Sequence, residues 1–208
     1  FFKSFKYRVP SDPSSCAFFI VLTLLSKNCE LKIKNVNVNK SRVGYIEILN
    51  KMGAQIKIKN VRLKYGEKIA DIFVKSQKTL KKINCPPSLS SNLIDEFLII
   101  FLAAAKAKGV SSFTNLGELN KKESPRLKLG SKLLNQLGIK TKLTKNSIKI
   151  FGNPRIDLKK RMHIKNYFKD HRIFMTSVIA AYTFGGKWKI NDVDSYKSSF
   201  PSFLDIIK

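Results

Sequence analysis

Two kinds of hydrophobic pattern alternate along the chain. Nearly unbroken apolar runs at 17–25 and 97–105 predict buried helices, because an amphipathic helix would show polar residues every third or fourth position. Shorter segments such as 56–59 alternate apolar and polar residues, as a half-exposed strand does. Both apolar runs are far shorter than the roughly 20 residues of a membrane-spanning helix. The pattern therefore predicts an α/β protein without a membrane span.

The pattern occurs three times. Each unit starts at an aspartate, continues through a helix and a strand that closes on an asparagine, and then opens a second helix at a polar turn. The stretches from leading aspartate to closing asparagine are Asp12 to Asn35, Asp95 to Asn115 and Asp170 to Asn191, with separations of 23, 20 and 21 residues. Spacing this regular indicates three similar structural units.

Helix-capping residues support these boundaries. Asp12 precedes Pro13, and Asp95 and Asp170 also stand before apolar runs, so we expect all three aspartates to be N-caps, with Asp95 capping a helix over 96–108. Two second helices end at a glycine, Gly53 and Gly138, the residue that favours the left-handed C′ position.

Strands and loops follow from the same reading. We expect strands at 56–59 and 141–143 to expose one face to water, and 147–151 to return as a hairpin. Loops are expected at 65–68, 85–92 and 152–166, none long enough for an interdomain linker, so residues 1–208 are read as one domain.

Composition limits the function. The net charge of +26 is typical of nucleic-acid-binding proteins, but the lysines are scattered through nearly every segment rather than clustered. Aromatic residues such as Phe18, Phe97 and Phe113 lie in apolar segments, which favours a core role over base stacking. The three cysteines show no metal-ligand spacing, so we expect no metal and a reducing cytoplasm.

The segment 118–126, ELNKKESPR, is the strongest candidate for a site. It places lysines, carboxylates and an arginine in a turn between a predicted strand and a predicted helix. Basic side chains and backbone N–H groups at a helix start suit an anionic ligand, and the carboxylates suit proton transfer. A solvated, charge-mixed loop is the alternative for this segment taken alone.

Five segments together resemble the C-terminal half of the 5-enolpyruvylshikimate-3-phosphate (EPSP) synthase family of enolpyruvyl transferases. In order and spacing, the matching segments are 9–15, 95–96, 122–126, 170–175 and 199–201. The resemblance implies two lobes, each a threefold repeat of βαβαββ-like units forming an inside-out α/β barrel. The chain, which starts with Phe rather than Met, would be one such lobe and inactive without its N-terminal partner lobe.

The resemblance also implies a reaction. The 5-hydroxyl of shikimate 3-phosphate attacks C2 of phosphoenolpyruvate while C3 is protonated, and phosphate leaves from the tetrahedral intermediate. This transfer, a step towards the aromatic amino acids, needs no metal or organic cofactor. The protein would be a cytoplasmic monomer without a specific nucleic-acid partner.

Site residues carry over by matching motifs. Asp95, Glu123 and His171 would be the proton-handling groups. Lys122 and Asp95 would contact shikimate 3-phosphate. Arg126 and Arg172 would bind phosphoenolpyruvate through bidentate hydrogen bonds. Lys197 approximates a phosphate-binding lysine, although Ser198 separates it from the tripeptide it normally precedes.

Other matching positions are interpreted as structural. Asp12, Ser14 and Ser15 belong to a helix start, and Arg42 is expected to order the turn after the first unit.

Four departures from the family pattern stand out. Asn120 replaces an arginine, Pro125 an aspartate, Ser11 a glycine and Phe174 a small residue. Phe174 should displace neighbours in a packed helix, at roughly 1–3 kcal/mol without compensation.

Three other readings remain. A UDP-N-acetylglucosamine enolpyruvyl transferase shares the lobe architecture, but would not present these motifs in these places. A basic nucleic-acid-binding module and a catalytically dead remnant are the others.

Overall fold

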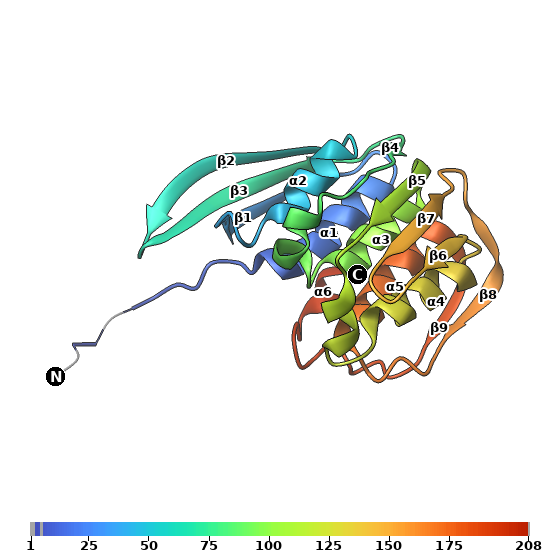
Figure 1. Cartoon of the computed structure of the whole chain (residues 1–208). Coiled ribbons are helices and arrows are strands. Elements are labelled where there is room, and N and C mark those ends of the chain that lie inside the picture. Colours follow the sequence, from blue (N-terminus) through green and yellow to red (C-terminus); the bar gives the residue numbers. More distant parts are fainter. Residues whose placement is uncertain (1–2, 5, 208) are drawn as a thin grey trace.

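The chain places three helices at its centre and its sheets around them (Figure 1). The structure, a computed structural model, describes residues 3–4 and 6–207. Its centre consists of three helices, α1 (Pro13–Leu25), α3 (Phe97–Ala105) and α5 (His171–Phe184), which pack against one another. Every residue of α3 is buried, because it has protein on all sides. The buried-helix predictions for both apolar runs are confirmed.

The second unit has the full βαβαββ order. It runs through β4 (Leu80–Lys81), α3, β5 (Ala107–Phe113), α4 (Arg126–Gln136), β6 (Thr141–Leu143) and β7 (Ile148–Gly152). The sheet order is β4-β5-β7-β6, with β4 parallel to β5 and the other pairs antiparallel. The predicted return at 147–151 is therefore confirmed as the β6–β7 hairpin.

The first unit repeats this plan with a shorter start. Ser11 bridges Val36 in place of a first strand, and β1 (Glu30–Asn37), α2 (Gly44–Lys51), β2 (Gln55–Lys64) and β3 (Glu67–Lys75) follow α1. The sheet order is β1-β3-β2, all antiparallel.

The third unit contains β8 (Leu158–Ile164), α5, β9 (Gly185–Ile190) and α6 (Phe203–Ile207), with β8 parallel to β9. Within residues 3–4 and 6–207, the strands form three separate sheets rather than one closed barrel. Short 3-10 helices at Pro87–Leu89, Ser91–Leu93 and Gly117–Lys121 complete the chain.

Two of the three predicted aspartate caps are confirmed. The Asp12 carboxylate accepts the Ser15 N–H at 2.8 Å, and Asp170 accepts the N–H groups of Arg172 and Ile173. The prediction for Asp95 was wrong: α3 begins at Phe97, Glu96 occupies the cap position, and the Asp95 carboxylate is engaged by cations instead. Gly53 (φ 90°) and Gly138 (φ 82°) have the left-handed conformation expected of C′ residues.

Two further predictions were wrong. The expected loop over 152–166 contains strand β8. Its buried residues are Leu158, Met162 and Ile164, and the lysines and arginine between them interrupt the alternating apolar pattern that would have predicted a strand. The first alternating strand, β2, is exposed on both faces beyond Ile56, because the β2–β3 hairpin extends past the helices (Figure 1).

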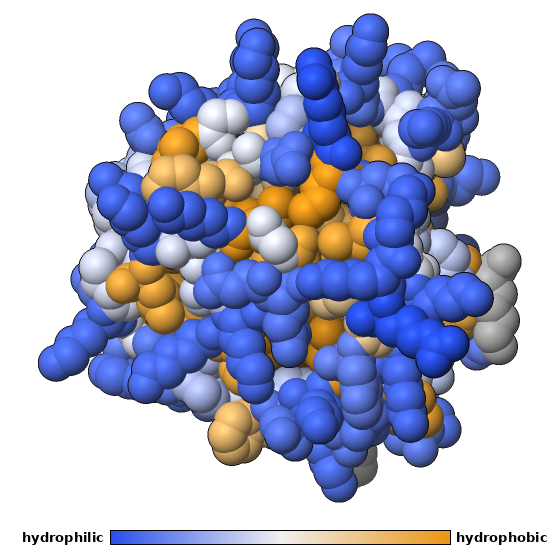
Figure 2. All heavy atoms as spheres, turned by 90° about the vertical axis from the view of Figure 1, so that its right-hand side faces the viewer, coloured by the Kyte–Doolittle hydropathy of each residue, from blue (hydrophilic) through white to orange (hydrophobic). Residues whose placement is uncertain are grey.

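The core runs continuously through all three units and includes aromatic side chains from each of them. Phe18, Phe97 and Phe113 are buried, as predicted. On the side of β8 and β9, hydrophilic side chains cover the surface between small apolar areas (Figure 2). Among the described helices, none has the length and apolar character needed to cross a bilayer.

Candidate active site

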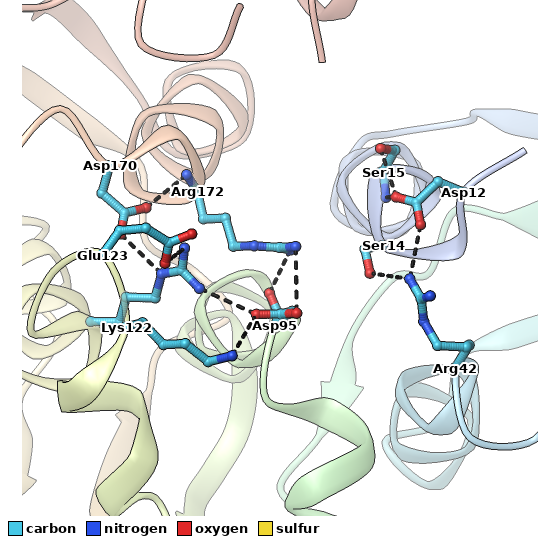
Figure 3. A network of polar contacts seen from close by, with 10 residues as sticks. Asp12, Ser14, Ser15, Arg42, Asp95, Lys122, Glu123, Asp170 and Arg172 are labelled. Atoms are coloured by element: carbon cyan, nitrogen blue, oxygen red, sulfur yellow. Dashed lines mark hydrogen bonds and ion pairs between the residues drawn. The ribbon is translucent and has the colours of Figure 1, made fainter. Parts of the chain in front are cut away.

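Three segments that are distant in sequence meet at one end of the central helices (Figure 3). Asp95 lies just before α3, Lys122 and Glu123 lie in the turn before α4, and Asp170 and Arg172 lie at the start of α5. The helices α3 and α5 pack against each other, and Arg172 at the start of α5 donates to the Asp95 carbonyl just before α3, so these helix starts lie at the same end of the lobe. We call Asp95, Lys122, Glu123, Arg126, Asp170 and Arg172 the Asp95 cluster.

Arg126 is the centre of this cluster. Its side chain is only 1% exposed, and it reaches three carboxylates. Nε donates to Asp170 Oδ2 at 2.9 Å, Nη1 donates to Asp95 Oδ1 at 3.2 Å, and Nη2 lies 2.6 Å from Glu123 Oε2. The last contact is an ion pair without hydrogen-bond geometry. A guanidinium this deeply buried needs such compensation, because an unpaired buried charge costs several kcal/mol.

Asp95 receives three cations. Besides Arg126, Lys122 Nζ lies 3.5 Å from Oδ1 and Arg172 Nη2 lies 3.8 Å from Oδ2. Partial burial opposes ionisation, but the charges of Arg172, Lys122 and Arg126 outweigh it and lower the pKa of Asp95 below its usual value. Asp95 is therefore ionised at neutral pH and still partly accessible.

Asp170 has a role that the sequence analysis missed. Beyond capping α5, its fully buried carboxylate accepts the Ser124 hydroxyl at 2.7 Å and the Arg126 Nε. Burial raises the pKa of Asp170, but the hydrogen bond from Ser124 and the charge of Arg126 lower it by more. Asp170 thus joins the α4 turn to α5, and the match of segment 170–175 to the family pattern could have pointed to it.

Arg172 fixes the backbone at Asp95 as well as the side chain. Its Nη1 donates to the Asp95 carbonyl oxygen at 2.7 Å, and its Nε is buried without a hydrogen-bond partner among the described residues. One donor of the guanidinium is therefore left for an additional acceptor.

His171 and Lys197 are placed differently. His171 starts α5, where burial and the neighbouring charge of Arg172 lower its pKa, so the imidazole is neutral at pH 7. The amine of Lys197 pairs with Asp194 at 2.6 Å rather than with the Asp95 cluster.

A second polar group lies at the start of α1 (Figure 3). Arg42 Nη2 donates to Asp12 Oδ1 at 3.0 Å and contacts the Ser14 hydroxyl at 3.4 Å. Asp12 also accepts the N–H and hydroxyl of Ser15. These contacts hold the α2 turn on α1, the structural role expected for Arg42.

The departures from the family pattern are accommodated locally. Phe174 is buried and stacks on Tyr196, with ring centroids 5.5 Å apart, so a neighbouring ring matches the large side chain. Pro125 occupies the cap position of α4 with φ −71°, which a proline adopts freely. Asn120 accepts the Lys128 N–H at 3.4 Å, and Ser11 makes the bridge to β1.

The cluster combines three cations with three carboxylates. A pocket beside Lys122 is lined by further polar groups, including Ser90, Ser91, Asn115 and Glu118. Arginine and lysine side chains suit phosphate and carboxylate groups, and a half-exposed carboxylate among them suits proton transfer. In the described part of the chain, no group of three His, Cys, Asp or Glu residues is arranged to hold a metal ion.

Comparisons with known proteins agree with this geometry. The family model of EPSP synthase (3-phosphoshikimate 1-carboxyvinyltransferase) matches residues 2–207. A 3-phosphoshikimate 1-carboxyvinyltransferase from Ruthia magnifica subsp. Calyptogena magnifica is 39% identical over 203 residues, covering 98% of this chain and 46% of the relative. The one from Vesicomyosocius okutanii is 40% identical, covering 96% and 45%.

Solved structures give the same result. An EPSP synthase from Acinetobacter baumannii superposes with a TM-score of 0.90 at 36% identity, covering 95% of this chain and 45% of that one. The enolpyruvyl transferase NikO from Streptomyces tendae shares the fold, with a TM-score of 0.67 at 14% identity. The chain spans just under half the length of the relatives it matches.

The threefold α/β architecture, the match over nearly the whole chain and the superposition lead to one assignment: this chain belongs to the EPSP synthase family.

Proposed function

We propose that residues 1–208 form one lobe of an enzyme that transfers the enolpyruvyl group of phosphoenolpyruvate to the 5-hydroxyl of shikimate 3-phosphate. The observation that carries the proposal is the convergence of Lys122, Arg126 and Arg172 on Asp95. This arrangement supplies cations for anionic substrates and a carboxylate for proton transfer at one place.

Each residue has a chemical role in this proposal. Asp95 accepts the proton of the attacking hydroxyl as its oxygen bonds to C2 of phosphoenolpyruvate. Glu123 delivers a proton to C3 and removes one again when phosphate leaves, and neutral His171 stands beside it. Arg126 and Arg172 bind phosphoenolpyruvate, and Lys122 binds shikimate 3-phosphate. Lys197 would have to leave Asp194 to bind phosphate.

Substrate binding must reorganise the cluster. Arg126 is buried and fully engaged by carboxylates, so an anion reaches it only when Glu123 or Asp95 gives way. Arg172 offers its free Nε and its long contact to Asp95 as the easier first point of attachment. Losing a cation raises the pKa of Asp95, which makes it a stronger base when substrate is bound.

The rest of the enzyme follows from the family. A second lobe would complete the site, because the relatives are more than twice as long as the segment matched. We propose a cytoplasmic monomer that uses no cofactor. A nucleotide sugar as acceptor is disfavoured by the relatives, which are named for 3-phosphoshikimate.

The test is a chimera in which residues 1–208 replace the matching segment of the Ruthia magnifica relative. We expect phosphate release from phosphoenolpyruvate that requires shikimate 3-phosphate. UDP-N-acetylglucosamine serves as the control acceptor, and release with the nucleotide sugar alone would contradict the proposal.

Variants of the chimera test the residue roles. Asp95→Asn should lower kcat by roughly 10²- to 10⁴-fold, the usual contribution of a general base, and Glu123→Gln should also lower kcat. Glu47→Gln is the matched control, since Glu47 pairs with Lys51 on α2, outside the Asp95 cluster. Equal effects of Glu47→Gln and Glu123→Gln would remove Glu123 from the chemistry.

A further inference from the structure

The loop that leads to Lys122 lies against the turn of the β6–β7 hairpin. The Leu116 N–H donates to the Asn146 carbonyl oxygen at 3.0 Å, and the Gly117 N–H donates to Asn146 Oδ1 at 2.6 Å. Asn146 thus accepts two consecutive N–H groups where the 3-10 helix Gly117–Lys121 begins. The hairpin therefore fixes the start of the helix that ends beside Lys122.

The Asn146 turn is ordered by hydrogen bonds of its own. The Thr144 N–H donates to the Ser147 carbonyl oxygen at 2.9 Å, and the hydroxyls of these two residues lie 2.8 Å apart. The Asn146 N–H donates to Thr144 Oγ1 at 3.2 Å. Strand β7 continues from this turn and pairs with β5, with Ile148 opposite Phe113. The turn is an extension of the sheet and gives the loop a firm support.

The loop and the turn fit closely at Gly117. A Cβ atom at this position would lie 3.3 Å from Asn146 Oδ1, so even one added carbon would press on the asparagine. Asn146 is exposed, and a hydrogen bond for which water competes contributes little to the free energy of unfolding. We therefore expect the Asn146 side chain to matter more for the position of the loop than for stability.

The first unit has a similar contact in which the side-chain acceptor changes sides. The Val38 N–H donates to the Lys68 carbonyl oxygen at 2.8 Å, and the Lys68 N–H donates to Asn39 Oδ1 at 3.4 Å. The asparagine acceptor belongs to the loop here, whereas in the second unit it belongs to the hairpin. Because the first-unit loop leads to Arg42, outside the Asp95 cluster, Asn39 offers a matched control.

The second-unit loop carries two groups of the proposed mechanism. Lys122 directly follows the 3-10 helix and lies 3.5 Å from Asp95 Oδ1, and Glu123 Oε2 lies 2.6 Å from Arg126 Nη2. Asn146 and Lys122 also line the same pocket. A shift of the loop at its contact with Asn146 would therefore move both groups relative to Asp95.

We propose that Asn146 is a positioning residue, which accepts the Gly117 N–H and thereby holds the loop so that Lys122 and Glu123 face the substrates. This inference rests on the proposed roles of Lys122 and Glu123. Proton transfer depends steeply on distance, so a displaced Glu123 loses rate, and a displaced Lys122 binds shikimate 3-phosphate less well. Arg172 is held on α5, so the binding of phosphoenolpyruvate should change less.

The kinetic experiment uses the chimera described above. Asn146→Ala removes the side-chain acceptor and should lower kcat roughly 10-fold and raise the KM for shikimate 3-phosphate, with little change in the KM for phosphoenolpyruvate. Asn146→Asp keeps an oxygen for the Gly117 N–H and should keep kcat within about threefold of the parent. Asn39→Ala removes the corresponding contact of the first unit and should leave kcat and both KM values unchanged.

Gly117→Ala tests the contact from the other side. Gly117 does not have a left-handed φ, so alanine causes no backbone strain there, but its methyl group meets Asn146 Oδ1. We expect a lower kcat, and a smaller effect of Gly117→Ala when residue 146 is already alanine, because the opposing oxygen is then absent. The proposal is wrong if Asn146→Ala lowers kcat no more than Asn39→Ala does, or if Asn146→Asp is as damaging as Asn146→Ala.

The Asp95 carboxyl reports the position of the loop without catalysis. The charge of Lys122 lowers the pKa of Asp95, so withdrawal of Lys122 should raise it. Carbon-detected NMR titration of the chain should show a higher pKa of Asp95 in Asn146→Ala than in Asn39→Ala. An inactive chimera together with this rise would contradict the proposed function and support the positioning role. An equal pKa of Asp95 in the two variants would overturn the positioning role, whether or not the chimera is active.

Discussion

Arg42 and Arg126 occupy equivalent places in two units but have different surroundings. Each lies at the start of its unit's second helix and pairs with the aspartate that precedes the first helix. The Arg42 and Asp12 side chains are 52% and 48% exposed, whereas Arg126 is 1% exposed and its equivalent partner Asp95 38%. Arg126 also pairs with Asp170 of the third unit, whose side chain is fully buried. One sequence plan thus produced a surface contact in one unit and a buried charge network in another.

The difference shows that the burial of such an ion pair determines how much it affects the free energy of unfolding. Water screens the Arg42 pair, so its contribution to stability is at most about 1 kcal/mol. Arg126 lost its hydration on folding, and only its three carboxylates compensate that cost. The same burial leaves its guanidinium strong and directed towards a substrate anion.

Removing Arg126 should have the largest effect. Arg126→Met leaves Asp170 buried without its cation, and we expect a loss of about 3–5 kcal/mol in the free energy of unfolding. Urea denaturation of the chain measures this loss, with Arg42→Met as the matched control. Equal losses for the two variants would mean that burial does not distinguish the two sites.

Asp170→Asn should have an intermediate effect that depends on pH. The pKa of Asp170 is lowered in the folded state, so its contribution is present above the unfolded pKa and is lost as pH falls through the folded pKa. We expect Asp170→Asn to cost about 1–3 kcal/mol at pH 7 and progressively less in acid.

Melting curves from pH 7 to pH 3 test this prediction. Asp12→Asn is the control at pH 7, because asparagine is an equally good N-cap and Asp12 is exposed. A difference between Asp170→Asn and the parent that stays constant with pH would contradict the assignment.

The smallest effect is expected for Arg42→Met. Its loss should stay below about 1 kcal/mol and shrink further when salt is raised to about 1 M, which screens exposed pairs within a few ångströms. A loss above about 2 kcal/mol would show that Arg42 contributes more to stability than a screened surface pair does. Unfolding in low and high salt measures this contribution.

Local features of the fold were predictable from the sequence. Uninterrupted apolar runs predicted buried helices α1 and α3, and Gly53 and Gly138 marked helix ends, since these signals depend on neighbouring residues only. Strand β8 was missed because Leu158, Met162 and Ile164 are separated by basic residues, and its pairing partner β9 lies about 20 residues away.

The candidate site was partly predictable. The motifs indicated Asp95, Lys122, Glu123, Arg126 and Arg172, and the structure brings these five together. Asp95 was expected to cap α3, but a carboxylate near three cations gains more from them than from backbone N–H groups. The link from Asp170 to Arg126 joins residues from different units, which no local pattern reveals.

The sequence by itself determined the threefold repeat, the buried helices, the family and the residue types of the site, because periodicity, capping residues and motif spacing are properties of the linear chain. Only the tertiary structure decided which charges are buried together. Desolvation and ion pairing depend on distances across units, and these gave Arg126 three carboxylates and left Arg42 exposed beside Asp12.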